Sequence, residues 1–236
     1  MDKIQDLKPQ CASLTDQAYN QLEEMIVTLQ LEPGAVLSEG TLGSQLGLGR
    51  TPIREALQRL AREGLVVILP RKGILVSEIN PRNQLLVLEV RRELERLLAR
   101  TSAIRSTEEE RARFFEIAEG MEQAAKESDD IIFLRLDYAL NMLVSQAAHN
   151  DYASRAMGLL HGMSRRFWYM HYKESADLPL CARLHAVLAR HIAEGDPDGA
   201  AAASDKLVDY AETFTRATLD TGSLGRSARQ TPRAVS

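Results

Sequence analysis

The chain has 236 residues, of which 44% are hydrophobic and 26% charged, and its formal net charge is −4. These fractions are those of globular proteins and exclude a wholly disordered or fibrous chain, while the length corresponds to roughly one or two domains. The acidic balance by itself argues against a nucleic-acid binder. The sequence has no membrane-span-length apolar stretch, secretory signal, disulfide pattern or zinc pattern. We therefore expect a cytoplasmic protein with no membrane partner.

The N-terminal third of the chain predicts three helices. Apolar residues at spacings of three and four over residues 18–29 predict the first. Ser38 is suited to cap a short second helix, and Gly47-Leu48-Gly49 predicts a tight turn after it. We expect the third helix to begin at Thr51-Pro52, with the hydroxyl as its cap and proline at its first position.

The periodicity then changes from that of a helix to that of a strand. The apolar runs 65–69 and 74–76 lie on either side of Pro70-Arg71-Lys72-Gly73, which predicts two strands joined by a basic turn. Three helices followed by a hairpin, in this order, are typical of a winged helix-turn-helix. Asn80-Pro81 ends the domain, which we assign to residues 1–79.

Everything beyond this break predicts helix. Helical segments are expected near residues 84–102, 107–126, 130–148, 152–173, 178–194 and 197–219. The predicted fold is therefore mainly α: an N-terminal winged helix-turn-helix followed by an all-α helical bundle over residues 82–220. Residues 221–236, rich in Gly, Ser, Thr and Arg, are expected to form a disordered tail.

Positive charge is concentrated in one segment. Residues 50–72 hold six basic and two acidic residues, a net +4, which leaves −8 for the rest of the chain. In a winged helix, this third helix and hairpin reach the major groove and the flanking phosphates. Arg50 and Arg54 are four residues apart at the helix start, where arginine can bond guanine and the helix N-terminus beside Thr51 can bind phosphate. The alternative is that these arginines merely solvate one helix face, but their coincidence with a glycine turn and a basic hairpin favours DNA.

The same segment closely resembles the N-terminal domain of GntR-family transcription regulators. The resemblance rests on residues 37–65 and 71–73, and its Arg50–Leu57 run is highly specific. It implies binding to a double-stranded DNA operator. The expected DNA-binding residues are Ser38, Arg50, Thr51, Arg54, Arg71, Lys72 and Gly73. Two positions depart from the family pattern: Gly40 stands where an arginine usually contacts DNA, and Gly49 where serine is common, so operator affinity or preference is expected to differ.

The helical remainder resembles the FCD effector domain of the FadR/VanR branch of that family. The stretches that carry this resemblance are 88–95, 137–150 and 184–203. It implies a homodimer whose bundle binds a small effector, which we expect to be a carboxylate. The assigned effector-binding residues are Arg91, Asp137, Asn141 and His185. Arg91 would capture the carboxylate through its guanidinium fork, although an ion pair with Glu95 at i+4 is the alternative. For the other three residues, the alternative is a hydrogen-bond network without a ligand.

The resemblance also raises the question of a metal. Many FCD domains bind a divalent metal through an Asp, a His four residues later and two further His. The corresponding positions here are Asp137, Asn141, His185 and Leu207. Leucine cannot ligate and an amide oxygen replaces imidazole poorly, so two good ligands remain where three or four are usual. We therefore predict no tightly bound metal and name no other cofactor.

The leading hypothesis is a ligand-responsive, homodimeric transcription regulator, most simply a repressor that a small organic acid releases from a palindromic operator. One alternative is a helical, metal-assisted enzyme that uses Asp137 and His185; no nucleophile elbow, phosphate loop or complete ligand set supports an enzyme. The other is a winged helix that binds proteins, in which Arg50 and Arg54 are surface charges.

Overall fold

The computed structural model describes residues 13–71 and 73–227, with the side chains of 174, 175 and 220–227 left out. Contacts divide the chain into two compact units, Met1–Ile79 with Arg165–Met170, and Asn80–Ser164 with His171–Ser236. Across the described residues, no helix is long and apolar enough to cross a membrane.

Three helices of the first unit, α1 (Leu14–Val27), α2 (Glu39–Leu46) and α3 (Arg50–Arg62), form a helix-turn-helix with a preceding helix. α1 begins with a capping box, and α2 is capped as predicted, because the Ser38 hydroxyl accepts a hydrogen bond from the Thr41 amide. Gly47 ends α2 in the left-handed conformation, with φ 66°. Glycine adopts this conformation without the steric cost that a Cβ brings, so it permits the tight turn into α3.

The start of α3 differs from the prediction. Arg50 is already helical, and the cap residue is Gly49, which has extended backbone and makes no side-chain cap. Thr51 therefore lies inside the first turn and is not the hydroxyl cap that we expected. The misassignment arose because the Thr-Pro signature marks the first turn of a helix without fixing which residue precedes it.

The predicted hairpin is present as β2 (Val66–Leu69) and β3 (Gly73–Val76), and β1 (Val36–Leu37) adds a third strand. The sheet order is β1-β3-β2, all antiparallel. β1 was not predicted, because a two-residue strand has no readable alternation and is defined by its pairing with β3. The fully buried core of this unit consists of Ala18, Leu22, Ile26, Ile53, Ala56, Leu57, Leu60 and Leu65.

The second unit is helical throughout its described residues. Its helices are α4 (Pro81–Arg105), α5 (Glu108–Glu127), α6 (Asp130–Ala147), α7 (Asp151–Ser175), α8 (Leu178–Glu194) and α9 (Pro197–Ser227), of which α7 contributes residues 165–170 to the first unit. α4 starts at the predicted break, with Asn80 as its cap. α9 continues to Ser227, through the first residues of the segment predicted as a tail from 221, because extending a formed helix adds one hydrogen bond per residue. Residues 228–236 lie outside the described residues.

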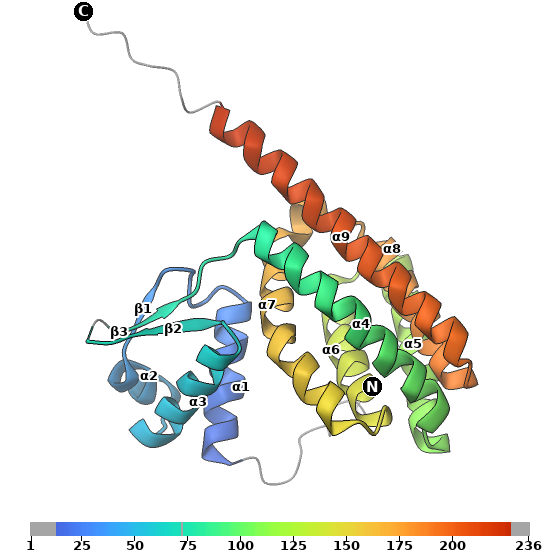
Figure 1. Ribbon diagram of the computed structural model, residues 1–236, viewed down its shortest axis with the longest axis horizontal. Coiled ribbons are helices and arrows are strands. Elements are labelled where there is room, and N and C mark those ends of the chain that lie inside the picture. Colours follow the sequence, from blue (N-terminus) through green and yellow to red (C-terminus); the bar gives the residue numbers. More distant parts are fainter. Residues whose placement is uncertain (1–12, 72, 228–236) are drawn as a thin grey trace, which may run out of the picture. The chain divides into compact units, whose positions relative to one another are not determined.

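Two pairs of helices dominate this unit: α4 lies along α9, and α5 packs on α8 (Figure 1). Buried alanines let the backbones approach closely; they are Ala182, Ala186, Ala189 and Ala193 on α8 and Ala200 and Ala203 on α9. Charged contacts join α4 to α9, since Arg92 pairs with Asp209 at 2.7 Å and Arg96 with Asp205 at 2.8 Å.

Candidate functional site

The predicted DNA-binding side chains fall at two places in the first unit. Arg50 and Arg54 are exposed on the first half of α3, and Arg71 is exposed in the turn between β2 and β3. We refer to these three side chains as the basic surface. Lys72, the fourth expected cation, lies outside the described residues.

Arg54 is held by a carboxylate from the neighbouring helix. Its Nε and Nη2 donate to the Glu39 carboxylate at 2.9 Å and 2.8 Å, and this bidentate pair joins α2 to α3. The hydrogen bond from Arg54 lowers the pKa of Glu39, and 61% of the Arg54 side chain stays exposed. Glu39 belongs to the resembling motif but was not assigned a role from the sequence, because its partner lies 15 residues away.

Arg59, although it belongs to the basic segment, is engaged within the domain. Its guanidinium lies 3.5 Å from the centre of the Tyr19 ring, and its Nε donates to Glu63 at 3.2 Å. Glu63 also accepts a hydrogen bond of 2.8 Å from the Tyr19 hydroxyl. Arg59 thus stabilises the contact between α1 and α3, as expected for a guanidinium stacked on an aromatic face.

Arg71 occupies an unfavourable backbone conformation. Its φ is 64°, in the left-handed region that glycine and asparagine adopt more readily. A side chain at such an angle costs on the order of 1 kcal/mol, and strained residues of this kind concentrate at functional sites. The conformation places an exposed cation in the hairpin turn.

Position 40, where the family usually has arginine, is sterically open. A Cβ built on Gly40 would meet only the Ser38 hydroxyl, at 3.9 Å, and Gly40 is not among the residues with positive φ. The missing arginine is therefore not excluded by crowding or by the backbone.

The second unit brings together three of the four predicted effector residues, which we call the polar cluster: Asp137 and Asn141 of α6 and His185 of α8. The Asp137 Oδ1 atom lies 3.0 Å from His185 Nε2 and accepts a hydrogen bond of 3.0 Å from Asn141 Nδ2. Only 21% of the Asp137 side chain and 14% of the His185 side chain are exposed.

Both ring nitrogens of His185 face acceptors. Nδ1 lies 2.7 Å from the carbonyl oxygen of Cys181, and Nε2 faces the Asp137 carboxylate. A carbonyl and a carboxylate can only accept, so both nitrogens donate and the ring is an imidazolium. Burial alone lowers the pKa of His185, but the interactions with Cys181 and Asp137 outweigh it and raise the pKa well above its ordinary value.

Cys181 shares this environment without the properties of a nucleophile. Its sulfur lies 3.7 Å from His185 Nδ1, so the order Cys–His–Asp resembles a catalytic triad. However, the side chain is buried, and burial raises the pKa of the thiol. A buried neutral thiol is inert compared with the exposed thiolates that perform chemistry.

Arg91 forms the ion pair with Glu95 that we gave as the alternative to capture of a carboxylate effector. It forms an ion pair with Glu95, in which Arg91 Nε donates to the carboxylate at 2.6 Å. Only 17% and 19% of the two side chains are exposed. A carboxylate effector would have to displace Glu95 to use this guanidinium.

The residues at the implied metal positions do not fit a metal site. Leu207 supplies no donor and is buried, while Asn141 turns its amide nitrogen toward Asp137. His185 Nε2 lies 3.0 Å from the Asp137 carboxylate. Within the described residues, no group of three or more His, Cys, Asp or Glu side chains is placed to hold a metal ion.

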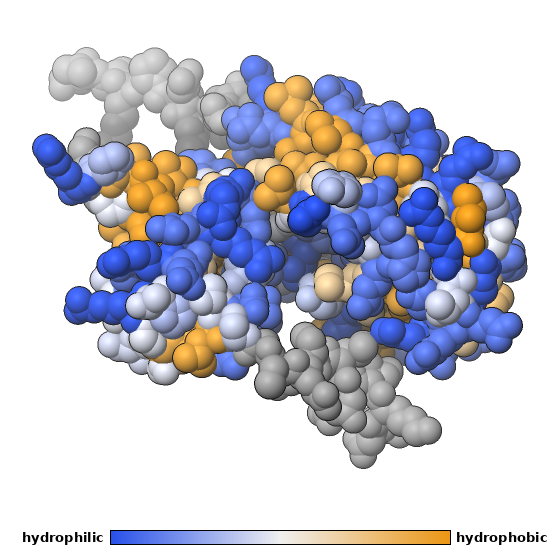
Figure 2. Space-filling model, turned by 60° about the horizontal axis from the view of Figure 1, so that its bottom comes forward, coloured by the Kyte–Doolittle hydropathy of each residue, from blue (hydrophilic) through white to orange (hydrophobic). Residues whose placement is uncertain are grey.

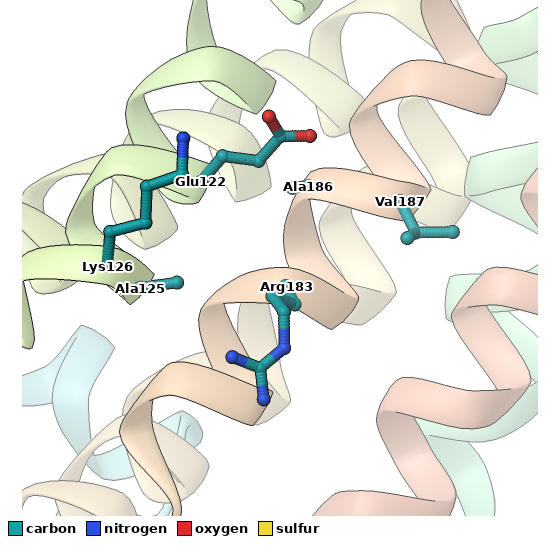
Figure 3. A pocket seen from close by; sticks show the side chains of 6 residues that line it. All are labelled: Glu122, Ala125, Lys126, Arg183, Ala186 and Val187. Carbon is teal, nitrogen blue, oxygen red and sulfur yellow. The ribbon is translucent and has the colours of Figure 1, made fainter.

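A separate cavity of about 350 Å³ lies between α5 and α8 (Figure 3). Its lining consists of Glu122, Ala125, Lys126, Arg183, Ala186 and Val187. The Glu122 carboxylate is paired with Arg190 at 2.7 Å. None of the predicted effector residues lines this cavity.

Comparison with known proteins identifies both units. Residues 14–76 match the family described as bacterial regulatory proteins, gntR family, and residues 86–210 match the FCD domain. An uncharacterized HTH-type transcriptional regulator of Streptomyces ambofaciens is 49% identical over 63 residues, which cover 27% of either chain. The match thus spans about a quarter of that relative's length.

Longer matches cover both units. The HTH-type transcriptional regulator McbR of Escherichia coli K12 is 28% identical over 178 residues, 73% of this chain and 77% of McbR. The solved structure of E. coli McbR/YncC has a TM-score of 0.74 at 22% identity and covers 89% of this chain and 100% of that one, which shows a shared fold. The chain therefore belongs to the GntR family of bacterial transcription regulators, with a winged helix-turn-helix followed by an FCD domain.

Proposed function

We propose that the protein is a homodimeric repressor that binds a palindromic operator through α3 and is released by a small organic-acid effector. The observation that carries this proposal is the basic surface: its three cations are exposed on the elements that reach DNA in a winged helix, on a chain that is otherwise acidic. A twofold dimer places two such surfaces on two half-sites, which requires a palindrome.

Arg54 is proposed to read a base and Glu39 to orient it. The bidentate contact with Glu39 leaves Nη1 of the guanidinium outside that ion pair and limits the rotamers of a long side chain. Preorganising a side chain in this way reduces the entropy lost on binding. Arg50, beside Thr51 at the helix start, and Arg71 in the hairpin turn are proposed to contact phosphates or bases on either side.

The polar cluster is proposed to bind the effector. It combines an imidazolium, a carboxylate and an amide within hydrogen-bonding distance, largely shielded from solvent. A carboxylate ligand would take over the His185 donor from Asp137. If this displacement favours one arrangement of the DNA-binding domains, a hundredfold loss of operator affinity requires only about 2.7 kcal/mol of differential binding.

The DNA half of the proposal is tested with a fragment from upstream of the protein's own gene, by fluorescence anisotropy. We expect Arg54→Ala to lower affinity roughly 10- to 100-fold and to relax preference at one base position. Arg62→Ala removes the same charge from the other end of α3 and should cause a smaller loss that is independent of sequence. Equal binding by Arg54→Ala and the parent would refute the assignment, and the absence of DNA binding would favour a protein-interaction module.

The effector half is tested with a panel of small organic acids. We expect one of them to raise the melting temperature and release the operator, and His185→Ala to bind operator normally but no longer respond. Turnover of an acid from the same panel would instead support the metal-assisted enzyme. Metal analysis of protein purified without chelator is the separate test of our metal assignment, which one tightly held divalent ion per chain would overturn.

A further inference from the structure

The cavity between α5 and α8, which we call the α5–α8 cavity, has the size of a small-molecule site. Its volume of about 350 Å³ lies within the range of roughly 300–1,000 Å³ that ligand pockets have in proteins. Part of its lining is small and apolar, because Ala125 and Ala186 are at most 7% exposed where the two helices pack together. Longer side chains of both helices complete the lining (Figure 3). The cavity therefore has an apolar part and a charged part.

Each of the two helices contributes a cation to the cavity. Lys126 of α5 and Arg183 of α8 are exposed and line it. Neither side chain forms a hydrogen bond or an ion pair with another residue that the structure describes. Both side chains are long and have several rotatable bonds. Their charged ends can therefore converge on one group that is bound between the two helices.

The carboxylate of the lining, Glu122, is already neutralised by another arginine. Arg190 Nε and Nη2 donate to Glu122 Oε1 at 3.0 Å and 2.7 Å. Arg190 follows Arg183 by seven residues, which places it two turns further along the same face of α8. With Arg190 included, three cations and one carboxylate give the site a net charge of +2. This sign is opposite to that of the −8 carried outside residues 50–72.

Exposed charges are ordinarily explained by their solvation alone. Hydrophilic residues cover much of the surface drawn in Figure 2. Lys126 and Arg183 differ from isolated surface charges in two respects: they border the same cavity, and the carboxylate beside them is bound by Arg190. Like charges that share a cavity repel each other, and a bound anion would remove this repulsion.

A phosphate monoester matches this set of groups. At neutral pH its phosphate carries a charge of about −1.5 to −2 and has three terminal oxygens that accept hydrogen bonds. The planar guanidinium of Arg183 can bind two of these oxygens, while the ammonium group of Lys126 acts as a point charge. The rest of the ligand would lie against the apolar part of the lining, which consists of Ala125, Ala186 and Val187.

We propose that the α5–α8 cavity is a second small-molecule site, which binds the phosphate group of a small phosphorylated metabolite through Arg183 and Lys126. Arg190 supports this site by keeping the Glu122 carboxylate engaged. The site shares no residue with the polar cluster or with the basic surface, and it does not rest on the proposed function.

The proposal is tested by isothermal titration calorimetry of the full chain with glycerol 3-phosphate, without DNA. We expect glycerol 3-phosphate to bind and glycerol not to bind. Arg183→Gln and Lys126→Gln should each raise the dissociation constant at least about tenfold, because each removes a charge that contacts the phosphate. Lys206→Gln and Arg216→Gln, which change exposed cations of α9 outside the cavity, are the matched controls and should leave the constant within about twofold of the parent. Circular dichroism establishes that all variants are folded.

Two further variants separate the site from a folding defect and from the DNA-binding surface. Glu122→Gln keeps the shape of the side chain and removes the negative charge of the lining, so it should lower the dissociation constant several-fold. A folding defect would not strengthen binding. Arg50→Gln, on the basic surface, should have no effect. Loss of binding in Arg50→Gln but not in Arg183→Gln would place the phosphate at the DNA-binding surface and overturn the proposal.

Other results would also overturn the site. These are the absence of binding at millimolar glycerol 3-phosphate, equal affinity of the parent, Arg183→Gln and Lys126→Gln, and binding of glycerol as tight as that of its phosphate. Tighter binding of succinate than of glycerol 3-phosphate would overturn the assignment to phosphate. Operator binding and release by organic acids are measured in separate titrations, so failure of this site and failure of the proposed function are distinguishable.

Discussion

Asp137 and His185 form an ion pair in which Oδ1 lies 3.0 Å from Nε2, and both side chains are largely buried. Removing the carboxylate takes away the counter-ion of His185, so the ring either stays charged in a poorly solvated site or gives up its proton together with the charge-assisted hydrogen bond, and both are costly. Asp137→Ala should therefore reduce the free energy of unfolding by about 3 kcal/mol, measured by urea denaturation at neutral pH. Met142→Ala, on the same helix and 48% exposed, is the control and should cost less than about 1 kcal/mol. Equal losses in the two variants would show that the pair carries no buried charge.

Arg71 links backbone strain to DNA binding. Asparagine tolerates φ near 64° better than arginine, so Arg71→Asn should leave the free energy of unfolding unchanged or raise it by up to about 0.5 kcal/mol. The same change removes a cation from each hairpin of the proposed dimer. The plot of log affinity against log salt should become less steep by about two units. A stability loss with unchanged salt dependence would contradict both expectations.

At the scale of the element, the C-terminus of α8 depends on an arginine from another helix. Gly195 ends α8 with φ 74°, and Arg111 of α5 donates to the Ala193 carbonyl at 3.1 Å and to the Ala103 carbonyl at 2.8 Å. A Cβ at position 195 would lie 2.5 Å from Arg111 Nη1 and would push the guanidinium away from these carbonyls, and the positive φ itself favours glycine.

Arg111→Met keeps the length of the apolar stem and removes these donors. We expect the free energy of unfolding to fall by about 1.5–3 kcal/mol in chemical denaturation, because helix-end carbonyls lose charged partners. Arg113→Met, two residues further along α5 and on a different face, should have a much smaller effect. Similar losses for both would mean that the helix-end contacts do not matter.

The junction between α8 and α9 should make stability sensitive to acid. The Gly199 amide donates to Asp196 Oδ1 at 2.9 Å, and this bond, with His191 3.0 Å from Oδ2, lowers the pKa of Asp196. A depressed folded pKa gives stabilisation that is present above the unfolded value of about 3.9 and lost as the pH falls through the folded pKa. Between pH 5 and pH 3, the melting temperature of Asp196→Asn, measured by calorimetry, should therefore fall less than that of the parent. Identical profiles would contradict this.

The elements that the sequence predicted well are those whose signals are local. The periodicity of the helices, the Ser38 cap and the break at Asn80-Pro81 involve residues a few positions apart, and each was confirmed. What could not be predicted depends on distant partners. β1 exists because it pairs with β3, and Arg54 faces Glu39 because α2 and α3 pack together. Likewise, the spacing of residues along the sequence does not show whether Arg91 pairs with Glu95 or binds a ligand.

For the whole molecule, the partition of charge predicts how binding depends on salt. Six arginines of the proposed dimer's two basic surfaces correspond to a log–log slope of about −5, so operator affinity should fall roughly a thousandfold between 50 and 200 mM salt. Anisotropy titrations across this range measure the slope. The net charge of −8 outside residues 50–72 repels DNA, so binding to DNA without the operator sequence should be weak at every salt concentration in this range. Affinity that is insensitive to salt would exclude a phosphate-dominated interface.

The space around Gly40 would accept a larger side chain without a change in the fold. Because a Cβ there meets only the Ser38 hydroxyl at 3.9 Å, side chains can be exchanged at this position without repacking α2. Arginine also favours helix more than glycine does, by up to about 1 kcal/mol. If position 40 contacts operator DNA, as the resemblance to the family implies, a single substitution there is expected to change operator preference without disturbing the packing of α2.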